Sequence, residues 1–236
     1  MKARTHTDLY LLFGAQHKDF RNENLMELVL SLTRGKTLLD VGCGYGPLLI
    51  KARQKGLDAY GLEPDPALVA LARQHDPSLR ITPSTLEAFE STELYDNVVL
   101  IDILECVPAV EPVLEKCAQL VKSGGQLIVV APALSWLFGA RDRMMGYYRR
   151  CDREPLTAWI RALGLHIVHV RYWNALLVIP YALLYQVLNR QSQYEQLRGQ
   201  SQGLVSKVLF VWFKWIENKI NFGFGLSLIV VAQKKR

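Results

Sequence analysis

The segment from Asp40 to Gly46, Asp-Val-Gly-Cys-Gly-Tyr-Gly, has the residue types and spacing of a cofactor-binding turn. Glycines tolerate positive φ and let a ligand approach the backbone without a Cβ in the way. We expect the N–H groups of this turn to face a carboxylate or phosphate. The G-x-G-x-G spacing behind an acid differs from the G-x-G-x-x-G of dinucleotide-binding loops. An acid there repels a pyrophosphate and accepts bonds from a cofactor's amino group, directly or through water. The turn therefore favours a cationic, ribose-bearing cofactor over NAD.

A second acid, Glu63, supports this interpretation. Glu63 lies 23 residues after Asp40, in the stretch Glu63-Pro64-Asp65-Pro66. An acid just past the second strand of a nucleotide-binding fold can accept both ribose hydroxyls. The alternative is that Glu63 is a solvated turn residue.

The elements that must position these residues alternate between strand and helix. Val/Ile/Leu-rich runs without polar alternation indicate a parallel sheet covered on both faces. The expected helices are 47–55, 66–74 and 110–121, and the expected strands are 37–41, 59–62, 79–82, 97–101, 126–130, 167–170 and 226–232.

We expect a single domain over residues 1–236. It would consist of a helical cap (1–35), a cofactor-binding core (36–174), an apolar helical insertion (175–225) and the last strand (226–236). Half of the residues are hydrophobic, which suffices for a sizeable core. The four cysteines show no C-x-x-C pairing, so we expect no metal site and no disulfide framework, as in a reducing cytoplasm. The polar, basic start of the chain is not typical of a signal peptide.

The excess positive charge lies in the C-terminal third. Residues 167–236 carry 9 Lys and Arg against 2 Asp and Glu, and this part is also the most apolar. On a helix over 204–218, Lys207, Lys214 and Glu217 share one polar arc, and most of the remaining circumference is apolar. Such a surface can pack on residues 172–188 as a lid, form a homodimer interface, or lie on a membrane surface. In the last case the cytoplasmic protein would be peripheral at the inner face of a membrane.

Three features together resemble the motifs of class I (Rossmann-like) S-adenosylmethionine-dependent methyltransferases: Asp40 to Gly46, Glu63, and the stretch Leu104-Glu105-Cys106-Val107-Pro108. The resemblance implies a doubly wound α/β fold with a seven-stranded, mostly parallel sheet whose last strand is antiparallel, and S-adenosyl-L-methionine as the cofactor. Thr85 and Leu86 would flank the adenine, and Asp102 and Leu104 would line the methionine end. The cofactor-binding residues it implies are Asp40, Gly42, Cys43, Gly44, Gly46, Glu63, Pro64, Thr85, Leu86, Asp102 and Leu104.

Residues 136–150 resemble the type 11 and type 12 subgroup of these enzymes, whose pattern is close to W-x-x, D and G-H-Y-R-R-Y. Tyr147 and Cys106 stand where that subgroup commonly has histidines, and Cys151 stands where it has Tyr. We name Glu105, Tyr147 and Tyr148 as candidate catalytic residues that accept a proton. The alternative for Glu105 is a structural acid that bonds loop N–H groups. The predicted substrate-binding residues are His17, Trp136, Asp142, Arg149 and Arg150. The two arginines would hold an anionic group or, alternatively, pair with Asp142, Asp152 or Glu154 to fix the loop.

The expected reaction transfers a methyl group to an O or N nucleophile of a small, amphipathic or lipid-linked molecule. A nucleic-acid methyltransferase and a non-enzymatic, cofactor-binding scaffold remain alternatives. Nucleic acid is not the expected partner, because no RNA-binding module or regular basic and aromatic stripe is present.

Overall fold

The computed structural model describes residues 20–183 and 204–235, and in them seven strands form one sheet in the order β3-β2-β1-β4-β5-β7-β6. The strands are β1 (Thr37–Val41), β2 (Asp58–Leu62), β3 (Arg80–Thr82), β4 (Tyr95–Ile101), β5 (Val121–Pro132), β6 (His166–Trp173) and β7 (Ser227–Gln233). β1 to β5 pair in parallel, and β7 is antiparallel to both β5 and β6. The expected seven-stranded α/β sheet with an antiparallel last strand is confirmed.

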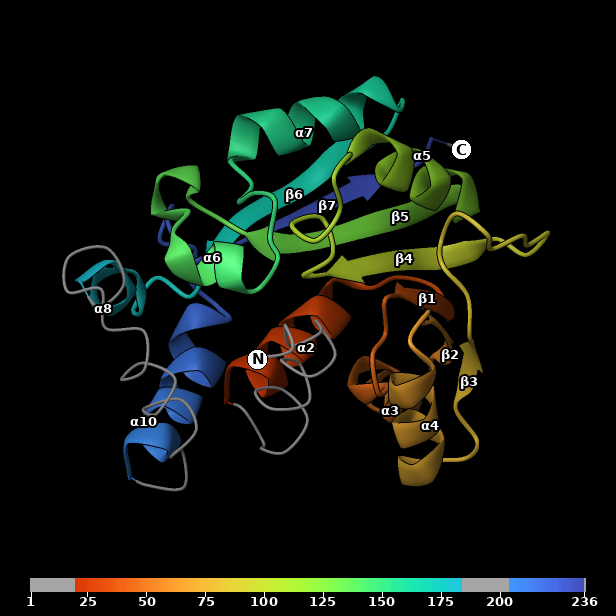
Figure 1. Ribbon diagram of the computed structural model, residues 1–236, viewed down its shortest axis with the longest axis horizontal. Coiled ribbons are helices and arrows are strands. Elements are labelled where there is room, and N and C mark those ends of the chain that lie inside the picture. The colour runs from red at the N-terminus through yellow and green to blue at the C-terminus, as the bar shows by residue number, and fades with distance from the viewer. Residues whose placement is uncertain (1–19, 184–203, 236) are drawn as a thin grey trace.

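Helices cover both faces of the sheet (Figure 1). Those with the longest runs are α2 (Phe20–Leu32), α3 (Pro47–Gln54), α4 (Pro66–His75), α5 (Glu111–Leu120), α7 (Arg153–Ala162) and α10 (Leu204–Trp212). Successive residues of a strand point to opposite faces. Accordingly Leu127 and Val129 of β5 join the core under α5 and α7, whereas Ile128 and Val130 join the core under α2 and α3. The sheet is therefore the middle of three layers, as the apolar runs predict.

The first described helix and the helix that precedes β7 lie side by side on one face of the sheet. α2 packs beside α10 (Figure 1). Asn24 Nδ2 donates to the carbonyl of Phe210 at 3.4 Å, and Asn218 Nδ2 donates to the carbonyl of Asn24 at 3.0 Å. The N-terminal cap and the insertion before β7 thus form one wall. Within residues 20–183 and 204–235, no helix has the length and hydrophobicity needed to cross a membrane.

The helix expected over 204–218 changes its winding near its end. α10 stops at Trp212, and the π-helical turn η3 (Phe213–Glu217) continues it. A π-turn places one more residue in the turn and so rotates the side chains beyond it relative to regular α spacing. At the end of this turn Glu217 is buried, and in the regular helix before it Val208 and Val211 are 59% and 54% exposed. The polar arc obtained with uniform helical steps is therefore wrong at Glu217.

Candidate active site

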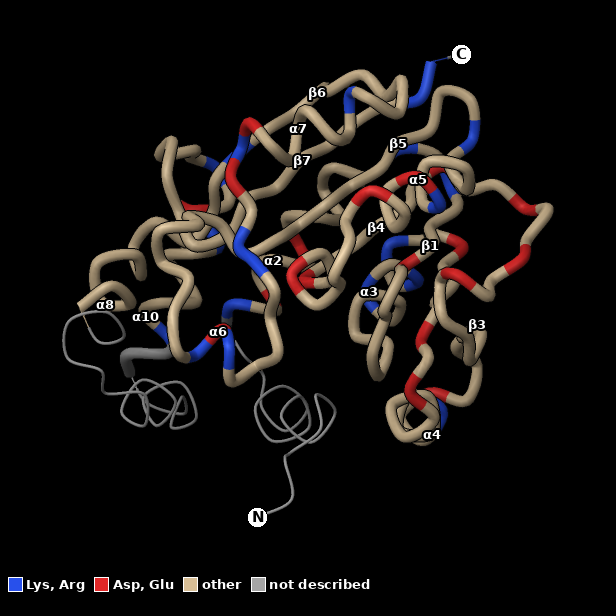
Figure 2. The backbone as a smooth tube through the Cα atoms, turned by 45° about the horizontal axis from the view of Figure 1, so that its top comes forward, with Lys and Arg blue, Asp and Glu red and all other residues tan. Residues whose placement is uncertain are grey.

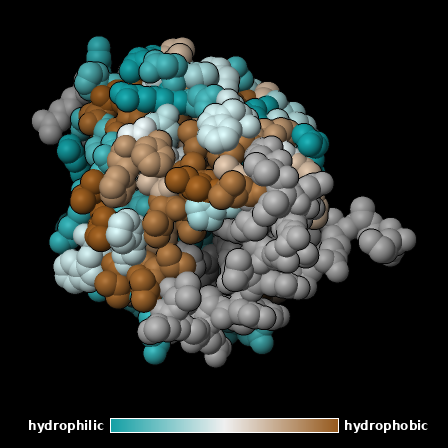
Figure 3. All heavy atoms as spheres, turned by 90° about the vertical axis from the view of Figure 1, so that its left-hand side faces the viewer, coloured by the Kyte–Doolittle hydropathy of each residue, from teal (hydrophilic) through white to brown (hydrophobic). Residues whose placement is uncertain are grey.

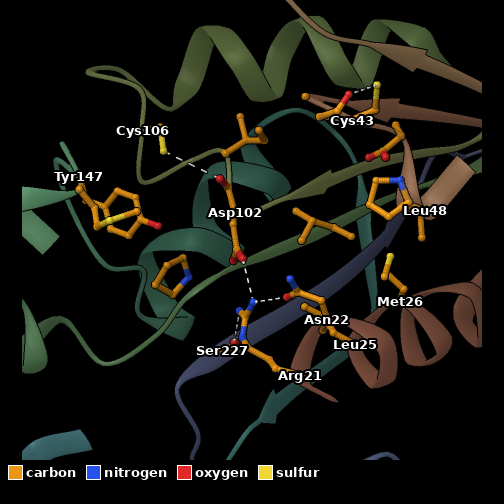
Figure 4. Close-up of a pocket in the computed structure, with 18 of the residues that line it drawn as sticks. Arg21, Asn22, Leu25, Met26, Cys43, Leu48, Asp102, Cys106, Tyr147 and Ser227 are labelled. Carbon is orange, nitrogen blue, oxygen red and sulfur yellow. Dashed lines mark hydrogen bonds and ion pairs between the residues drawn. The ribbon is translucent and has the colours of Figure 1, made fainter. Parts of the chain in front are cut away.

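A cavity of about 520 Å³ opens at the carboxyl ends of β1 and β4. Ligands of open parallel sheets bind at this edge, where the strand order reverses. The walls come from the start of α2, the glycine turn, the loops after β2 and β4, the short helix α6 (Ala140–Met144) and the chain around β6 and β7 (Figure 4). The volume lies in the range of small-molecule sites.

The glycine turn connects β1 to α3 in a conformation that side chains resist. Gly42 and Gly46 have φ of 74° and 82°, in the left-handed region that favours glycine. A Cβ on Gly42 would lie 2.3 Å from Ile103 Cδ1, and one on Gly46 would lie 2.8 Å from Leu79 Cδ1. The turn thus brings bare backbone to the cavity wall.

The backbone N–H groups of this turn are used inside the protein. Gly42 and Cys43 donate to the carbonyl of Leu62 at 2.7 and 3.0 Å, and Gly44 donates to Glu63 Oε2 at 2.9 Å. The expectation that the turn presents these N–H groups to an anionic ligand is therefore wrong. They tie the ends of β1 and β2 together instead.

Two acids form one end of the cavity. Asp40 is almost fully buried, and that burial, with the charge of Glu63, raises the pKa of Asp40 to about 7. Glu63 is also buried, and its Oε1 accepts the N–H of Asp65 at 2.9 Å. Each carboxylate oxygen has a second lone pair for a ribose hydroxyl or an amino group. The residues present therefore fit a cofactor that carries hydroxyls and a positive charge.

Asp102, which follows β4, lies in the same cavity wall. Its backbone is left-handed, with φ 55°, and its buried Oδ1 has no hydrogen-bond partner in the described structure. Its Oδ2 forms an ion pair with Arg21 Nη1 at 3.2 Å, and Arg21 Nη2 donates to Ser227 Oγ at 3.3 Å (Figure 4). A left-handed residue other than glycine is rare and marks functional sites. Asp102 is thus held beside the cavity with one oxygen left for a ligand.

Of the three residues predicted to take a proton, the structure places Tyr147 in the cavity wall. Glu105 lies behind that wall, wholly buried, and neither of its carboxylate oxygens meets a partner among the residues described. Burial, with the charge of Asp102, raises the pKa of Glu105 well above its usual value. Burial and the charge of Glu105 likewise raise the pKa of Tyr147. Tyr148 is 59% exposed and does not line the cavity.

Arg150 and Asp142 form a buried ion pair on the cavity wall. Arg150 Nη2 lies 2.9 Å from Asp142 Oδ1 and its Nε lies 3.1 Å from Oδ2, so the pair is bidentate. Arg150 also donates to the hydroxyl of Tyr181, from the short helix α8 (Val178–Ala182), and to the carbonyl of Ala133 at 3.2 Å. This geometry matches the pairing alternative for Arg150, and its role toward substrate stays a prediction.

The other predicted residues take different places. Arg149 donates to the carbonyls of Leu104, Val107 and Pro108, so its guanidinium braces the loop after β4. Trp136 is 64% exposed. Thr85, Leu86, Leu104, Trp136 and Arg149 do not line the cavity, whereas Gly42, Cys43, Gly44 and Pro64 do. His17 lies outside the described residues.

Several lining residues could not be identified from the sequence: Arg21, Asn22, Leu25, Met26, Asn174, Tyr181, Leu226 and Ser227. They come from α2, from the chain after β6 and from the start of β7, which are far apart in the sequence. The one sequence signal was the helical spacing of Leu25, Leu28 and Leu32, which predicts α2 but not the direction of Arg21.

A family model for the methyltransferase domain matches residues 14–175. Curated relatives include ubiquinone biosynthesis O-methyltransferases of Aliivibrio fischeri, 38% identical over 99 residues, and of Cronobacter sakazakii, 37% identical over 112 residues. The first match covers 39% of this chain and 42% of the relative, and the second covers 44% and 46%. The similarity thus spans under half the length of these relatives.

Solved structures share the fold at low identity. The N-methyltransferase NodS of Bradyrhizobium japonicum with S-adenosyl-L-homocysteine has a TM-score of 0.62 at 15% identity, covering 98% of this chain and 100% of that one. The phosphoethanolamine N-methyltransferase 2 of Haemonchus contortus with S-adenosyl-L-methionine has a TM-score of 0.64 at 17% identity, covering 100% of this chain and 58% of that one. The family model covers more than half of the chain, so the chain belongs to the methyltransferase domain family.

Proposed function

We propose that this enzyme methylates a hydroxyl oxygen of a small amphipathic molecule. The observation that carries the proposal is the cavity itself, which has the acids Asp40 and Glu63 at one end and Tyr181 and Leu226, beside the apolar insertion, in its wall. The names of the curated relatives, ubiquinone biosynthesis O-methyltransferases, favour oxygen over nitrogen as the acceptor atom.

On this proposal Asp40, Glu63 and Asp102 hold the cofactor. Glu63 accepts ribose hydroxyls, and Asp102 Oδ1 accepts the amino group, which would supply the partner it lacks. When bound, S-adenosylmethionine would supply an electrophilic methyl group, which the acceptor oxygen would attack in line with the breaking methyl–sulfur bond, leaving the neutral thioether S-adenosylhomocysteine. Close placement of the acceptor contributes several kcal/mol to such a displacement.

Glu105 is the proposed proton acceptor, acting through Tyr147. Its raised pKa makes the Glu105 carboxylate, once ionised, a stronger base than an exposed one, and Tyr147, whose pKa the Glu105 charge raises, lines the cavity. As the acceptor oxygen bonds to the methyl carbon, the methyl–sulfur bond would break, and the hydroxyl proton would pass by way of Tyr147 to one of the Glu105 oxygens, which have no partner in the described structure.

An apolar patch next to the cavity suggests how an amphipathic acceptor arrives. We use the name apolar patch for the exposed apolar side chains in or directly after α8 and in α10 with η3, which are between 50% and 69% exposed: Ile179, Leu183, Val208, Val211 and Trp215. Lys219 Nζ and Lys214 Nζ lie 4.6 and 5.6 Å from the centre of the Trp215 ring. Figure 3 shows hydrophobic residues gathered on this side, and Figure 2 shows that the acidic residues gather at the opposite end, around β3 and α4.

The patch combines the features of a surface that docks on an anionic membrane. Tryptophan and lysine suit the boundary between acyl chains and anionic headgroups. Tyr181 lies between Ile179 and Leu183 in sequence and also lines the cavity. We propose that the patch docks on anionic lipid, so that an amphipathic acceptor passes from the bilayer to the cavity. Self-association through this patch is the competing outcome.

The acceptor class is tested with labelled S-adenosylmethionine and a matched set of acceptors: 4-decylcatechol, decylamine and total RNA. We expect label in decylcatechol and a loss of about 100-fold in kcat for Glu105→Gln, the usual size of a lost general base. Exposed Glu87→Gln, remote from the cavity, is the control. Label in RNA or decylamine but not in decylcatechol would contradict the proposal.

A further inference from the structure

Asn174 is a cavity residue to which the proposed reaction gives no role. It follows β6, is 2% exposed, and lines the cavity near Ser227. Its backbone is left-handed, with φ 67°, and its buried Oδ1 is without a hydrogen-bond partner in the described part of the chain. A buried acceptor oxygen without a partner is rare in folded proteins and calls for an explanation.

A buried carboxylate holds Asn174 in this conformation. Glu217 Oε2 accepts the N–H groups of Asn174 and Ala175 at 3.0 and 3.2 Å, and its Oε1 accepts those of Leu176 and Trp212 Nε1 at 3.0 and 3.3 Å. Four donors therefore fix this carboxylate against the chain that follows β6. Asparagine tolerates this left-handed conformation, and the Glu217 carboxylate fixes the turn in it.

The other side of the turn is fixed as well. The carbonyl of Asn174 accepts the N–H of Leu226 at 3.2 Å, which joins the turn to the start of β7. A Cβ on Gly225 would lie 2.3 Å from the carbonyl oxygen of Trp173, so the two segments touch backbone to backbone. The side chain of Asn174 is thus the part of the turn left to interact with a ligand.

Asn174 and the proposed cofactor-binding residues lie at different positions along the same edge of the sheet. β4, β5, β7 and β6 are neighbours in that order, so the cavity-facing ends run from Asp102 through Pro132 and Ser227 to Asn174. Asp40 lies on the other side of Asp102, at the end of β1. With the cofactor held by Asp40, Glu63 and Asp102, Asn174 lies in the acceptor half.

We infer that Asn174 Oδ1 is an acceptor subsite that selects substrates carrying a hydrogen-bond donor at their polar end. The inference rests on the proposed function and names what recognises the substrate's polar end. A bound hydroxyl supplies the missing partner of Oδ1. A substrate whose donors are blocked by methyl groups leaves this oxygen buried and unpaired, so binding is weaker.

The test is calorimetric titration of 4-decylcatechol, and separately of its dimethyl ether, into the protein saturated with S-adenosylhomocysteine. Wild type is expected to bind the catechol about tenfold more tightly than the ether, the effect of about one hydrogen bond. Equal affinity for the two probes would overturn the inference, and this comparison needs no variant.

Two variants place the effect at Asn174. Asn174→Gly keeps the left-handed backbone and removes the oxygen, whereas Asn174→Asp keeps an acceptor oxygen and tolerates positive φ. Asn174→Gly should lose the preference for the catechol, with melting temperature and S-adenosylhomocysteine affinity unchanged, and Asn174→Asp should retain it. If Asn174→Gly binds the catechol as tightly as wild type does, the subsite proposal is overturned. If the enzyme still methylates the catechol in that case, the proposed function stands. A wild type that neither binds nor methylates the catechol would overturn both.

Discussion

Arg21 Nη1 lies 3.2 Å from Asp102 Oδ2, so the helix that precedes the sheet is joined across the cavity to the end of β4. The pair is partly exposed, with 19% of the Arg21 side chain and 30% of the Asp102 side chain accessible. Ion pairs at such positions contribute about 1 kcal/mol or less to stability. The pair is therefore expected to affect ligand binding more than stability, because Arg21 places a positive charge where a cationic cofactor is expected.

Arg21→Gln should shift the cofactor preference of the enzyme. Without the guanidinium, Asp102 faces the cavity uncompensated and attracts the sulfonium of S-adenosylmethionine more than the neutral product S-adenosylhomocysteine. We expect the ratio of their affinities to change severalfold in favour of S-adenosylmethionine, with the free energy of unfolding changed by about 1 kcal/mol or less. Paired calorimetric titrations at low salt measure the ratio. An unchanged ratio of the two affinities would show that Arg21 does not interact with the cofactor.

Asp40 should make both stability and cofactor binding depend on pH. Folding raises its pKa from 3.8 to about 7, so over that interval the folded protein binds more protons than the unfolded chain. The free energy of unfolding therefore falls as pH rises from about 4 to about 7. Urea denaturation of wild type and Asp40→Asn across this range should show the decline in wild type and its loss in the variant.

The same residue predicts proton release on cofactor binding. Because the cationic cofactor favours ionised Asp40, its affinity should rise by up to about tenfold per pH unit below about pH 7. Titrations at pH 6 in buffers of different ionisation enthalpy detect the released proton, and Asp40→Asn should release none. Equal proton release by the variant and wild type would assign the pH dependence to another group.

Breaking the buried pair between Asp142 and Arg150 should destabilise the fold strongly. The side chains are 0% and 3% exposed, so either single change leaves a buried, uncompensated charge. We expect Asp142→Asn and Arg150→Met each to lower the free energy of unfolding by about 3–5 kcal/mol. The double variant should be more stable than the sum of the single effects predicts, because it leaves no buried charge. Additive losses in chemical denaturation would show that the pair is not coupled.

The apolar patch should bind anionic vesicles. Wild type is expected to co-sediment with vesicles of phosphatidylglycerol, less so at high salt because lysine attraction is screened. Val211→Glu should abolish binding, whereas Leu94→Glu, at an exposed apolar residue before β4, should retain it. Absence of wild-type binding, or a concentration-dependent dimer that Val211→Glu dissociates, would show that the patch serves another partner.

The sequence predicts the sheet well, and it identifies two acids, Asp40 and Glu63, that line one cavity, because both depend on local patterns. Apolar runs identify the strands, and the glycines and acids at the ends of β1 and β2 are adjacent in the chain to the turns they shape. Asp40 and Glu63 consequently face the cavity together, as their spacing suggests.

The remaining cavity residues could not be predicted in this way, because long-range packing positions them. Arg21 pairs with Asp102 from a helix that packs beside α10, and the turn at Asn174 is held by Glu217. Glu217 itself is buried through the π-turn, which uniform helical steps do not predict. The charges of Arg149 and Arg150 suit an anionic substrate. In the structure, however, Arg149 donates to loop carbonyls and Arg150 pairs with Asp142.

The most direct test of an amphipathic acceptor is the chain-length dependence of kcat/KM for methylation of a series of 4-alkylcatechols. If the acceptor's tail is buried along Tyr181 and Leu226, each added methylene should raise kcat/KM, by up to about fourfold where it is fully buried, until the chain outgrows the cavity. Methylation that is absent, or equally fast for catechol and its decyl derivative, would contradict an amphipathic acceptor.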